Sequence, residues 1–122
     1  MSETRRHRGA QSHHAGRCAE EAVARHYHAL GRSIAAERWR CPYGEIDLIA
    51  RDGDEVIFIE VKHSHSHAEA ALHLTSQQMG RIVNAASVFL GGEPLGQATP
   101  VRFDLAMVDG MGRIEVLEGA FA

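Results

Sequence analysis

Three carboxylates and one ammonium fall within a single short stretch of the sequence, YGEIDLIARDGDEVIFIEVK. They belong to Glu45, Asp47, Glu60 and Lys62. Magnesium prefers hard oxygen ligands, and one or two carboxylates with water and substrate phosphate oxygens suit it well. A lysine beside such an ion can orient a water and stabilise the charge that develops on a phosphodiester during hydrolysis. These residue types therefore favour metal-assisted phosphodiester hydrolysis, if the fold brings them together.

A β-hairpin would bring the four groups together. Two β-rich runs flank Asp52-Gly53, a dipeptide typical of the tight turns that join antiparallel strands. With this turn, the strands place Asp47 diagonally across from Glu60, close enough to share one ion. The expected pairs are Arg51 with Asp54, Asp47 with Phe58, and Glu45 with Glu60.

Alternation along the two strands predicts one apolar face and one face with a charged end. The apolar face is expected to hold Ile46, Leu48, Ala50, Ile57, Ile59 and Val61. The other face carries the four charged groups at one end and Ile49, Val56 and Phe58 toward the turn. Like charges opposite each other on a sheet are destabilising, which favours a divalent cation between them. The alternative is an exposed salt-bridge cluster of Lys62 with Glu60 and Asp47, which contributes little stability.

The composition is that of one globular domain. The chain has 122 residues, of which 44% are hydrophobic and 24% charged. No apolar run reaches membrane-spanning length, and the N-terminal segment lacks the apolar core of a secretory signal. The isolated Cys18 and Cys41 have no metal-binding spacing and are typical of cytoplasmic thiols. We therefore expect a cytoplasmic protein without a membrane partner.

The charges are unevenly distributed. A net charge of −3 argues against a general polyanion binder. Residues 1–40 hold eight arginines against four glutamates, whereas residues 41–122 hold four arginines and one lysine against twelve acids. The basic third can hold phosphates beside a cation-binding pocket, or it can be ordinary solvated surface. The only lysine is Lys62, and a lysine is a compact charge with an adjustable pKa, unlike arginine.

Helices are expected to flank the hairpin. Residues 1–12 lack periodicity and predict a flexible arm, followed by a single domain over residues 13–122. Further along the chain, Thr75 and Gln78 fit the two ends of a capping box. The expected elements are helices over residues 14–30 and 75–90, the hairpin over residues 43–62, and strands over residues 33–40, 101–108 and 113–118. Their order, α-β-β-β-α-β-β, predicts an α/β or α+β fold with one mixed sheet. The terminal residues 119–122 are expected to be frayed.

Other candidate residues have a structural and a functional interpretation. His63, His65 and His67 share a face in an extended segment; they can be flexible, contact a substrate phosphate or bind a transition metal. Unsupported histidines make a weak metal site, which favours the flexible interpretation. Trp39 and Tyr43 are expected in the core rather than stacked on bases. Separately, Arg102 and Asp104 are expected to form a structural ion pair.

Several segments resemble, in the right order, those of the YraN-like family of small bacterial proteins. That family is placed in the PD-(D/E)XK nuclease superfamily and is related to archaeal-type Holliday junction resolvases. The resemblance covers roughly residues 16–108. The matching segments are Gly16-Arg17-Cys18-Ala19-Glu20, Gly44-Glu45-Ile46-Asp47, Glu60-Val61-Lys62 and Arg102-Phe103-Asp104.

The resemblance implies a restriction-endonuclease-like core, which is a central mixed sheet flanked by helices. It also implies a Mg²⁺ or Mn²⁺ site, with Lys62 as the catalytic lysine and Glu45 as a neighbour of the ligands. The implied ligands are Asp47, Glu60, the Val61 backbone carbonyl and Glu20. From helical spacing alone, Glu20 can point into a cleft or into water, and the adjacent Glu21 competes for its role.

The chain departs from the family pattern in two places. The family continues its E-V-K motif with Thr-Arg, where this chain has His63-Ser64. The family also carries a lysine near the start of its second long helix, where this chain has Gln78. Both changes remove positive charge beside the expected path of the phosphates.

We therefore expect a Mg²⁺- or Mn²⁺-dependent endonuclease that acts on duplex or branched DNA, with the attacking water positioned by Lys62. Cutting a DNA junction needs two sites, which would require a symmetric homodimer. The alternative is a nuclease-fold module with weak or no cleavage that binds nucleic acid or a protein partner. The net acidity and Gln78 favour this alternative.

Overall fold

A mixed five-stranded sheet with helices on both faces forms the architecture of residues 2–122. The computed structural model describes the backbone of these residues and the side chains from residue 15 onward. The elements are α1 (Ser2–Ala29), β1 (Ser33–Cys41), β2 (Gly44–Asp52), β3 (Glu55–His63), α2 (His67–Leu72), α3 (Ser76–Leu90), the 3₁₀ turn η1 (Gly96–Ala98), β4 (Val101–Val108) and β5 (Ile114–Leu117). The predicted α+β class and order are confirmed, and the short α2 is an addition.

The sheet has the strand order β1-β2-β3-β4-β5, and β3 is its central strand. Strands β3 and β4 are parallel, whereas the other neighbouring pairs are antiparallel. A parallel pair needs a connection that crosses from one end of the sheet to the other, and the segment with α2 and α3 supplies it. Residues 56–61 of β3 are all buried because helices cover both faces of this strand.

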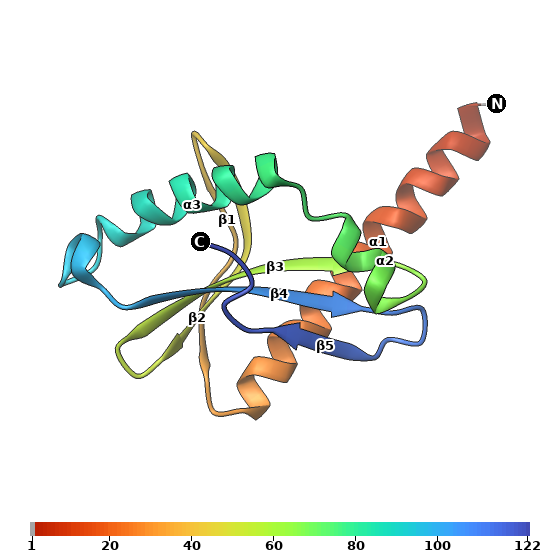
Figure 1. Cartoon of the computed structure of the whole chain (residues 1–122). Coiled ribbons are helices and arrows are strands. Elements are labelled where there is room, and N and C mark those ends of the chain that lie inside the picture. The colour runs from red at the N-terminus through yellow and green to blue at the C-terminus, as the bar shows by residue number, and fades with distance from the viewer. Residues whose placement is uncertain (1) are drawn as a thin grey trace.

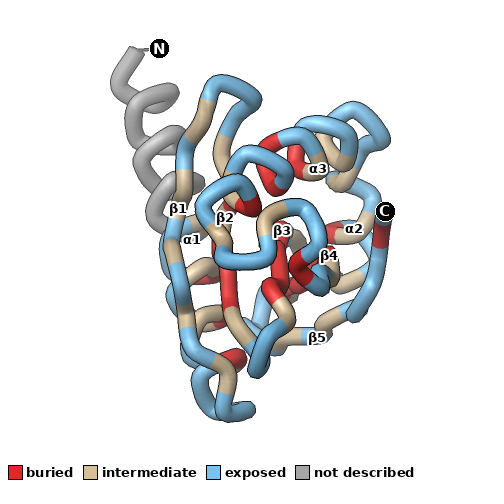
Figure 2. The backbone as a smooth tube through the Cα atoms, turned by 90° about the vertical axis from the view of Figure 1, so that its left-hand side faces the viewer, coloured by how far each residue is buried: buried red, intermediate tan, exposed pale blue. Residues whose placement is uncertain are grey.

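The two long helices lie on opposite faces of the sheet (Figure 1). Helix α1 packs against β2 and β3 through Ala19, Val23 and Tyr27. Helix α3 packs against the aromatic face of β3 and β4 through Ile82, Ala85, Ala86 and Leu90, and α2 adds Ala70 beside it. Figure 2 shows the buried residues concentrated in the central strands. No helix within residues 2–122 is both long and apolar enough to cross a membrane.

Helix α1 is longer than the sequence pattern predicts. It begins at Ser2 rather than near His14, and it ends as expected before Gly31, whose φ is +82°. The segment before His14 lacks an apolar period, but its arginines, glutamine and alanine are good helix formers and it contains no proline. Its backbone is therefore helical, while the division into an arm over 1–12 and a domain over 13–122 stays a prediction.

The predicted capping box at the start of α3 is confirmed. The Gln78 backbone N–H donates to Thr75 Oγ1 at 3.1 Å, and the Thr75 N–H donates to Gln78 Oε1 at 3.2 Å. Each side chain satisfies a backbone donor that the first helical turn leaves without a partner. This fixes the direction in which Gln78 leaves the helix.

The hairpin of β2 and β3 forms, but its predicted register is wrong by two residues. Asp52 pairs with Glu55 and Ile49 pairs with Phe58, so the loop consists of Gly53 and Asp54. Gly53 has a φ of +60°, and a type II′ turn needs a glycine at that first loop position. Because a shift of two residues keeps each side chain on its face, the predicted faces survive almost intact.

The C-terminal segment is docked rather than frayed. Phe121 is 9% exposed, and its ring lies 5.2 Å from that of Phe103. The Ala120 N–H donates to the Phe103 carbonyl at 2.8 Å, which continues the backbone pairing past β5. The apolar ring at the penultimate position of the sequence is the signal that indicates this docking.

A buried carboxylate, Asp104, ties α1 to β4. Arg102 donates to both of its oxygens, at 2.8 and 2.9 Å, and Tyr27 of α1 donates its hydroxyl proton at 2.7 Å. The Gly119 N–H also donates to Asp104, at 3.1 Å. The predicted structural role of the Arg102–Asp104 pair is thereby confirmed. Burial and the bond to Asp104 raise the pKa of Tyr27 above its ordinary range.

We expect Tyr27→Phe to lower the free energy of unfolding by about 1.5–3 kcal/mol, because it removes a hydrogen bond to a buried charge. Urea denaturation measures this loss. The control is Tyr43→Phe, since Tyr43 is 51% exposed and the same change there should stay within about 0.5 kcal/mol. Equal effects at the two tyrosines would contradict the assigned role of the network.

Candidate functional site

A cavity of about 300 Å³ opens where α1 passes the ends of β2 and β3. The carboxylates and the lysine predicted as catalytic or ligating groups all line it, together with Val61. The lining residues are Gly16, Glu20, Asp47, Glu60, Val61, Lys62, His63 and His73. Residues from one helix and two strands therefore converge on this cavity, although they lie up to 57 positions apart in the sequence.

Asp47 stands where the ladder between β2 and β3 stops. The last paired residues are Leu48 and Ile59, so one further rung would set Asp47 opposite Glu60. Instead, Asp47 Oδ2 accepts the Val61 backbone N–H at 2.8 Å. The carboxylate takes the place of a strand carbonyl, and it satisfies a buried donor that the end of the ladder would otherwise leave open.

The alternation of β2 side chains between the two faces of the sheet is interrupted at Asp47. Arg38 lies between two β1 residues that pair with Leu48 and Ile46, so it is the residue opposite Asp47, and its φ is +46°. Leu48 packs on the α1 face, whereas Ile46 packs on the α3 face. The prediction that Ile46 shares the face of Leu48 is therefore wrong, because both strands are irregular at this rung.

Asp47 and Glu60 form a buried, hydrogen-bonded pair of carboxyl groups. Burial is the main cause that raises the pKa of Glu60 to about 8, and the neighbouring Asp47 adds to it. Burial also raises the pKa of Asp47, although its bonds to Glu60 and to the Val61 N–H act in the other direction. Two like charges this close cannot both stay ionised in a low-dielectric site, so the pair retains a proton.

Lys62 faces the same pair. Its Nζ lies 3.4 Å from Glu60 Oε1, and its side chain is only 17% exposed. The ammonium favours the ionised form of both carboxylates, but burial outweighs this effect. The predicted arrangement of Asp47, Glu60 and Lys62 on one end of the hairpin is thus present, and the cluster is buried rather than an exposed surface salt bridge.

Glu20, rather than Glu21, turns toward the cavity. Its Oε2 lies 3.2 Å from the Nε of Arg38, and both groups are less than 40% exposed. Burial raises the pKa of Glu20, and the charge of Asp47 adds to this effect. Glu21 is exposed and lies outside the cavity that contains Asp47 and Glu60.

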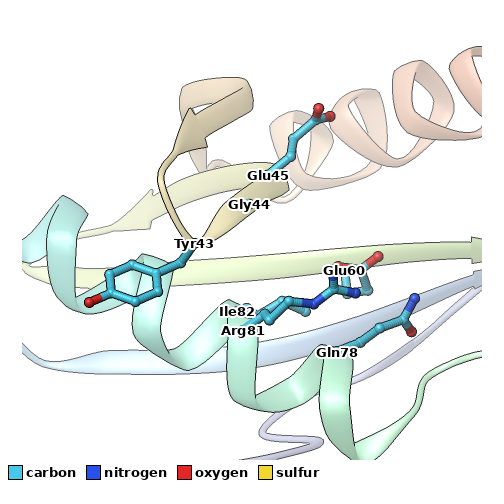
Figure 3. A pocket seen from close by; sticks show the side chains of 7 residues that line it. All are labelled: Tyr43, Gly44, Glu45, Glu60, Gln78, Arg81 and Ile82. Carbon is cyan, nitrogen blue, oxygen red and sulfur yellow. The ribbon is translucent and has the colours of Figure 1, made fainter.

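A second cavity, of about 220 Å³, meets Glu60 from the α3 side of the sheet. Gln78 and Arg81 reach it from α3, and Tyr43 reaches it from the turn between β1 and β2 (Figure 3). Glu45 also lines it, but its carboxylate points away from α3 and pairs with Arg40 at 3.2 Å. Tyr43 is 51% exposed, so the prediction of a core position is wrong for it.

Trp39 agrees with its prediction. Its ring packs edge-on against Phe89 of α3, with 5.4 Å between centroids, in the α3-side core.

The three alternating histidines do not share a face. Strand β3 ends at His63, and Ser66 caps α2, which begins at His67. His67 Nδ1 lies 3.0 Å from Glu115 on β5, whereas His63 lines the cavity of Asp47 and Glu60. The tract containing His65 is therefore a bend between a strand and a helix, and not one extended segment.

Sequence reasoning missed Arg38, His73 and Arg81. Arg81 had a signal, because it follows Gln78 by three positions and so lies on the same side of α3. Arg38 had none, since a left-handed conformation of a non-glycine residue in a strand is not visible in its sequence. His73 closes α2, an element that the sequence pattern did not predict.

The donor set fits a hard divalent cation. The two carboxyl groups now retain a proton in a cavity, and a cation can replace that proton. Among the side chains of residues 15–122, no three His, Cys, Asp or Glu groups are gathered closely enough to hold a metal ion by themselves. This matches Mg²⁺, which keeps several waters and uses one or two carboxylates with substrate phosphates.

The fold and the site define an α+β protein in which a carboxylate pair, a lysine and a helix glutamate share one cavity. Residues 19–108 match the family described as uncharacterised protein family UPF0102. A UPF0102 protein of Cereibacter sphaeroides is 66% identical over 114 residues, covering 93% of this chain and 97% of the relative. A UPF0102 protein of Ruegeria pomeroyi is 54% identical over 114 residues, which cover 93% of each chain. A UPF0102 protein of Roseobacter denitrificans is 41% identical over 122 residues, which cover 100% of this chain and 95% of the relative.

The chain therefore belongs to UPF0102, in agreement with the resemblance to the YraN-like family. The names of these relatives state no activity. The nuclease superfamily and its chemistry stay predictions from the resemblance.

The raised pKa of Glu60 predicts how stability depends on pH. Between the ordinary pKa of 4.5 and the folded value of about 8, the folded chain holds a proton that the unfolded chain has released. This contribution to stability is complete below about pH 4.5 and is lost as the pH rises through about 8. Glu60→Gln cannot ionise, so it should remove most of this loss and be more stable than wild type above pH 8.

Urea denaturation at a series of pH values, in a chelator, measures this effect. Asp54→Asn is the control, because Asp54 is exposed in the hairpin loop and also loses one carboxylate. A wild-type pH profile that Glu60→Gln leaves unchanged would contradict the buried, protonated pair.

Proposed function

We propose that this protein is a Mg²⁺- or Mn²⁺-dependent endonuclease of the cytoplasm that hydrolyses phosphodiesters of duplex or branched DNA. The observation that carries the proposal is the single cavity that Asp47, Glu60 and Lys62 all line, with the Lys62 Nζ 3.4 Å from Glu60 Oε1. The resemblance to the PD-(D/E)XK superfamily supports it, since the same positions match that superfamily's ligands and lysine.

The chain's own residues have separate roles in this reaction. Asp47 and Glu60 would hold the cation, and the Val61 carbonyl and Glu20 would be further ligands. A bound divalent cation would neutralise the carboxylates and the scissile phosphate and activate a water for attack. Lys62 Nζ, anchored 3.4 Å from Glu60 Oε1, donates a hydrogen bond to the attacking water and stabilises the charge that develops on the phosphate.

Cleavage of branched DNA would require more than one copy of the chain. Resolving a junction takes paired cuts on two strands, so two copies of the cavity must act together. We therefore propose a symmetric homodimer for that substrate, since two-fold symmetry presents two identical sites.

A second candidate function is a nuclease-fold module that binds nucleic acid or a protein partner and cleaves weakly or not at all. Two observations favour it. Gln78 stands where the family has a lysine, so the chain lacks that positive charge beside the cavity. Glu20 is also held by Arg38, so it must exchange that partner before it can bind a cation.

Cleavage of duplex, single-stranded and four-way-junction DNA with Mg²⁺ or Mn²⁺ separates the two candidates. Wild type should cleave, and Asp47→Asn and Lys62→Ala should each lower the rate by about 10² or more. Asp54→Asn is the control, because Asp54 is exposed in the hairpin loop, at the opposite end of β3 from Lys62. Binding of DNA without cleavage under every metal would exclude the endonuclease and support the binding module.

The geometry also distinguishes Glu20 from its neighbour. Glu20→Gln should weaken the binding of Mn²⁺ by about ten-fold, as expected for loss of a ligand or of its support. Glu21→Gln removes the same charge one residue away and should leave Mn²⁺ affinity within about two-fold. Isothermal titration calorimetry measures both variants. An equal loss of Mn²⁺ affinity in the two variants would contradict a specific role of Glu20, because it would then affect the ion only through its negative charge.

A further inference from the structure

The cavity on the α3 side of the sheet has no role in the chemistry proposed above. Its volume of about 220 Å³ is below the roughly 300–1,000 Å³ typical of pockets for whole drug-sized ligands. It therefore suits one phosphate-sized group, with the rest of a larger ligand lying outside the cavity. Glu60 lines both this cavity and the one that holds Asp47, so the two openings meet at one carboxylate.

Arg81 provides a positive charge in this cavity. Its side chain extends from α3 toward Glu60 (Figure 3). It makes no ion pair with any residue whose side chain is described, whereas Arg38, Arg40 and Arg102 each have a carboxylate partner. An uncommitted guanidinium can bind a phosphate through two parallel hydrogen bonds.

Gln78 adds a donor that the helix cap keeps oriented. Its Oε1 accepts the Thr75 N–H at 3.2 Å, so its Nε2 is left to donate to a ligand. Gln78 lies on the same side of α3 as Arg81, one turn earlier, and lines the same cavity. The two side chains thus offer a charged and a neutral donor to one anion.

Tyr43 supplies an aromatic surface at the rim of this cavity, with its ring directed away from Gln78 (Figure 3). It is 51% exposed, although it lines a cavity and carries a large apolar ring. Exposed aromatic rings beside positive charge are the usual platforms on which unpaired bases stack. Glu45, a half-buried carboxylate that also lines this cavity, is paired with Arg40, which limits its repulsion of a phosphate.

From this geometry we infer that the α3-side cavity binds one unpaired nucleotide of a DNA strand, with its phosphate on Arg81 and Gln78 and its base against Tyr43. The shared Glu60 sets this nucleotide next to the phosphodiester at the metal cavity, and in that respect the inference rests on the proposed function. Intact duplex keeps its bases stacked and paired, so it offers no free face to Tyr43. The substrate class is therefore DNA with unpaired nucleotides, such as single strands, overhangs and branch points.

Fluorescence anisotropy with the full chain tests binding separately from cleavage. The probes are a labelled short oligothymidylate, the same oligonucleotide with abasic sites, and a blunt duplex, each measured in Ca²⁺ and in EDTA. Wild type should bind the oligothymidylate about ten-fold more tightly than the duplex. Equal affinity for the two, or no binding in either condition, would overturn the inference.

Salt dependence identifies the phosphate contact. Arg81→Ala should lower the slope of log K against log salt by about 0.7, the value expected for one phosphate contact on a single strand. Arg81→Lys should restore most of that slope. Arg25→Ala is the matched control, because Arg25 is also exposed and has no carboxylate partner among residues 15–122, but it lies on α1, across the sheet. The same slope change in the Arg25 and Arg81 variants would contradict a specific phosphate site.

The abasic probe identifies the stacking contact. Tyr43→Leu should weaken binding of the oligothymidylate about five-fold or more without changing the salt slope. Tyr43→Phe keeps the ring and should bind like wild type. With the abasic probe, Tyr43→Leu and wild type should bind with the same affinity. A weaker affinity of Tyr43→Leu for the abasic probe as well would show that Tyr43 does not stack on a base.

Failure of this inference and failure of the nuclease proposal are distinguishable. Binding that depends on Tyr43 and Arg81 without any cleavage would contradict the nuclease and retain the nucleotide pocket. Cleavage that depends on Asp47 and Lys62, with wild-type binding by the Tyr43 and Arg81 variants, would contradict the pocket and retain the nuclease.

Discussion

Two carboxyl groups buried against each other, Asp47 and Glu60, are the interaction on which the candidate site depends. Removing both from water while leaving both charged is unfavourable, so the pair must hold a proton or a cation. Neighbouring groups reduce the free-energy cost of burying the two charges but do not remove it. The Val61 N–H and the Lys62 ammonium both favour the charged forms, but burial outweighs them. A site in this state favours the approach of a positive charge, which is the basis of the proposed cation site.

The sheet is interrupted to create this pair. If the ladder between β2 and β3 continued past Leu48, backbone carbonyls and not a carboxylate would accept the β3 donors. Arg38 adopts a left-handed conformation opposite Asp47, and such backbone conformations cost of order 1–3 kcal/mol for a non-glycine residue. The interruption lets Glu60 line a cavity on each face of a sheet that is elsewhere closed by helices.

Rigid elements hold the interrupted region in place. Asp104 joins β4 to Tyr27 near the end of α1, and the apolar side of α1 packs on β2 and β3. Glu20 lies on the same helix and is thereby carried to the cavity from a distant part of the chain. On the other face, the capping box fixes the first turn of α3 and hence the position of Gln78 and Arg81. Both cavities are thus built mainly from residues of helices and strands; Tyr43 and His73 lie just outside these elements.

The sequence by itself determined the five strands, the two long helices, their order and the charged end of the hairpin, but not the short α2. Periods of two and of three to four apolar residues depend only on local geometry, so they predicted β4, α3 and its cap at Thr75 and Gln78. Only the tertiary structure decided the hairpin register, the face of Ile46 and the exposure of Tyr43. These depend on which turn closes the hairpin, where the ladder stops and which helix covers each face. These features depend on contacts between residues far apart in the sequence, so the local sequence pattern does not predict them.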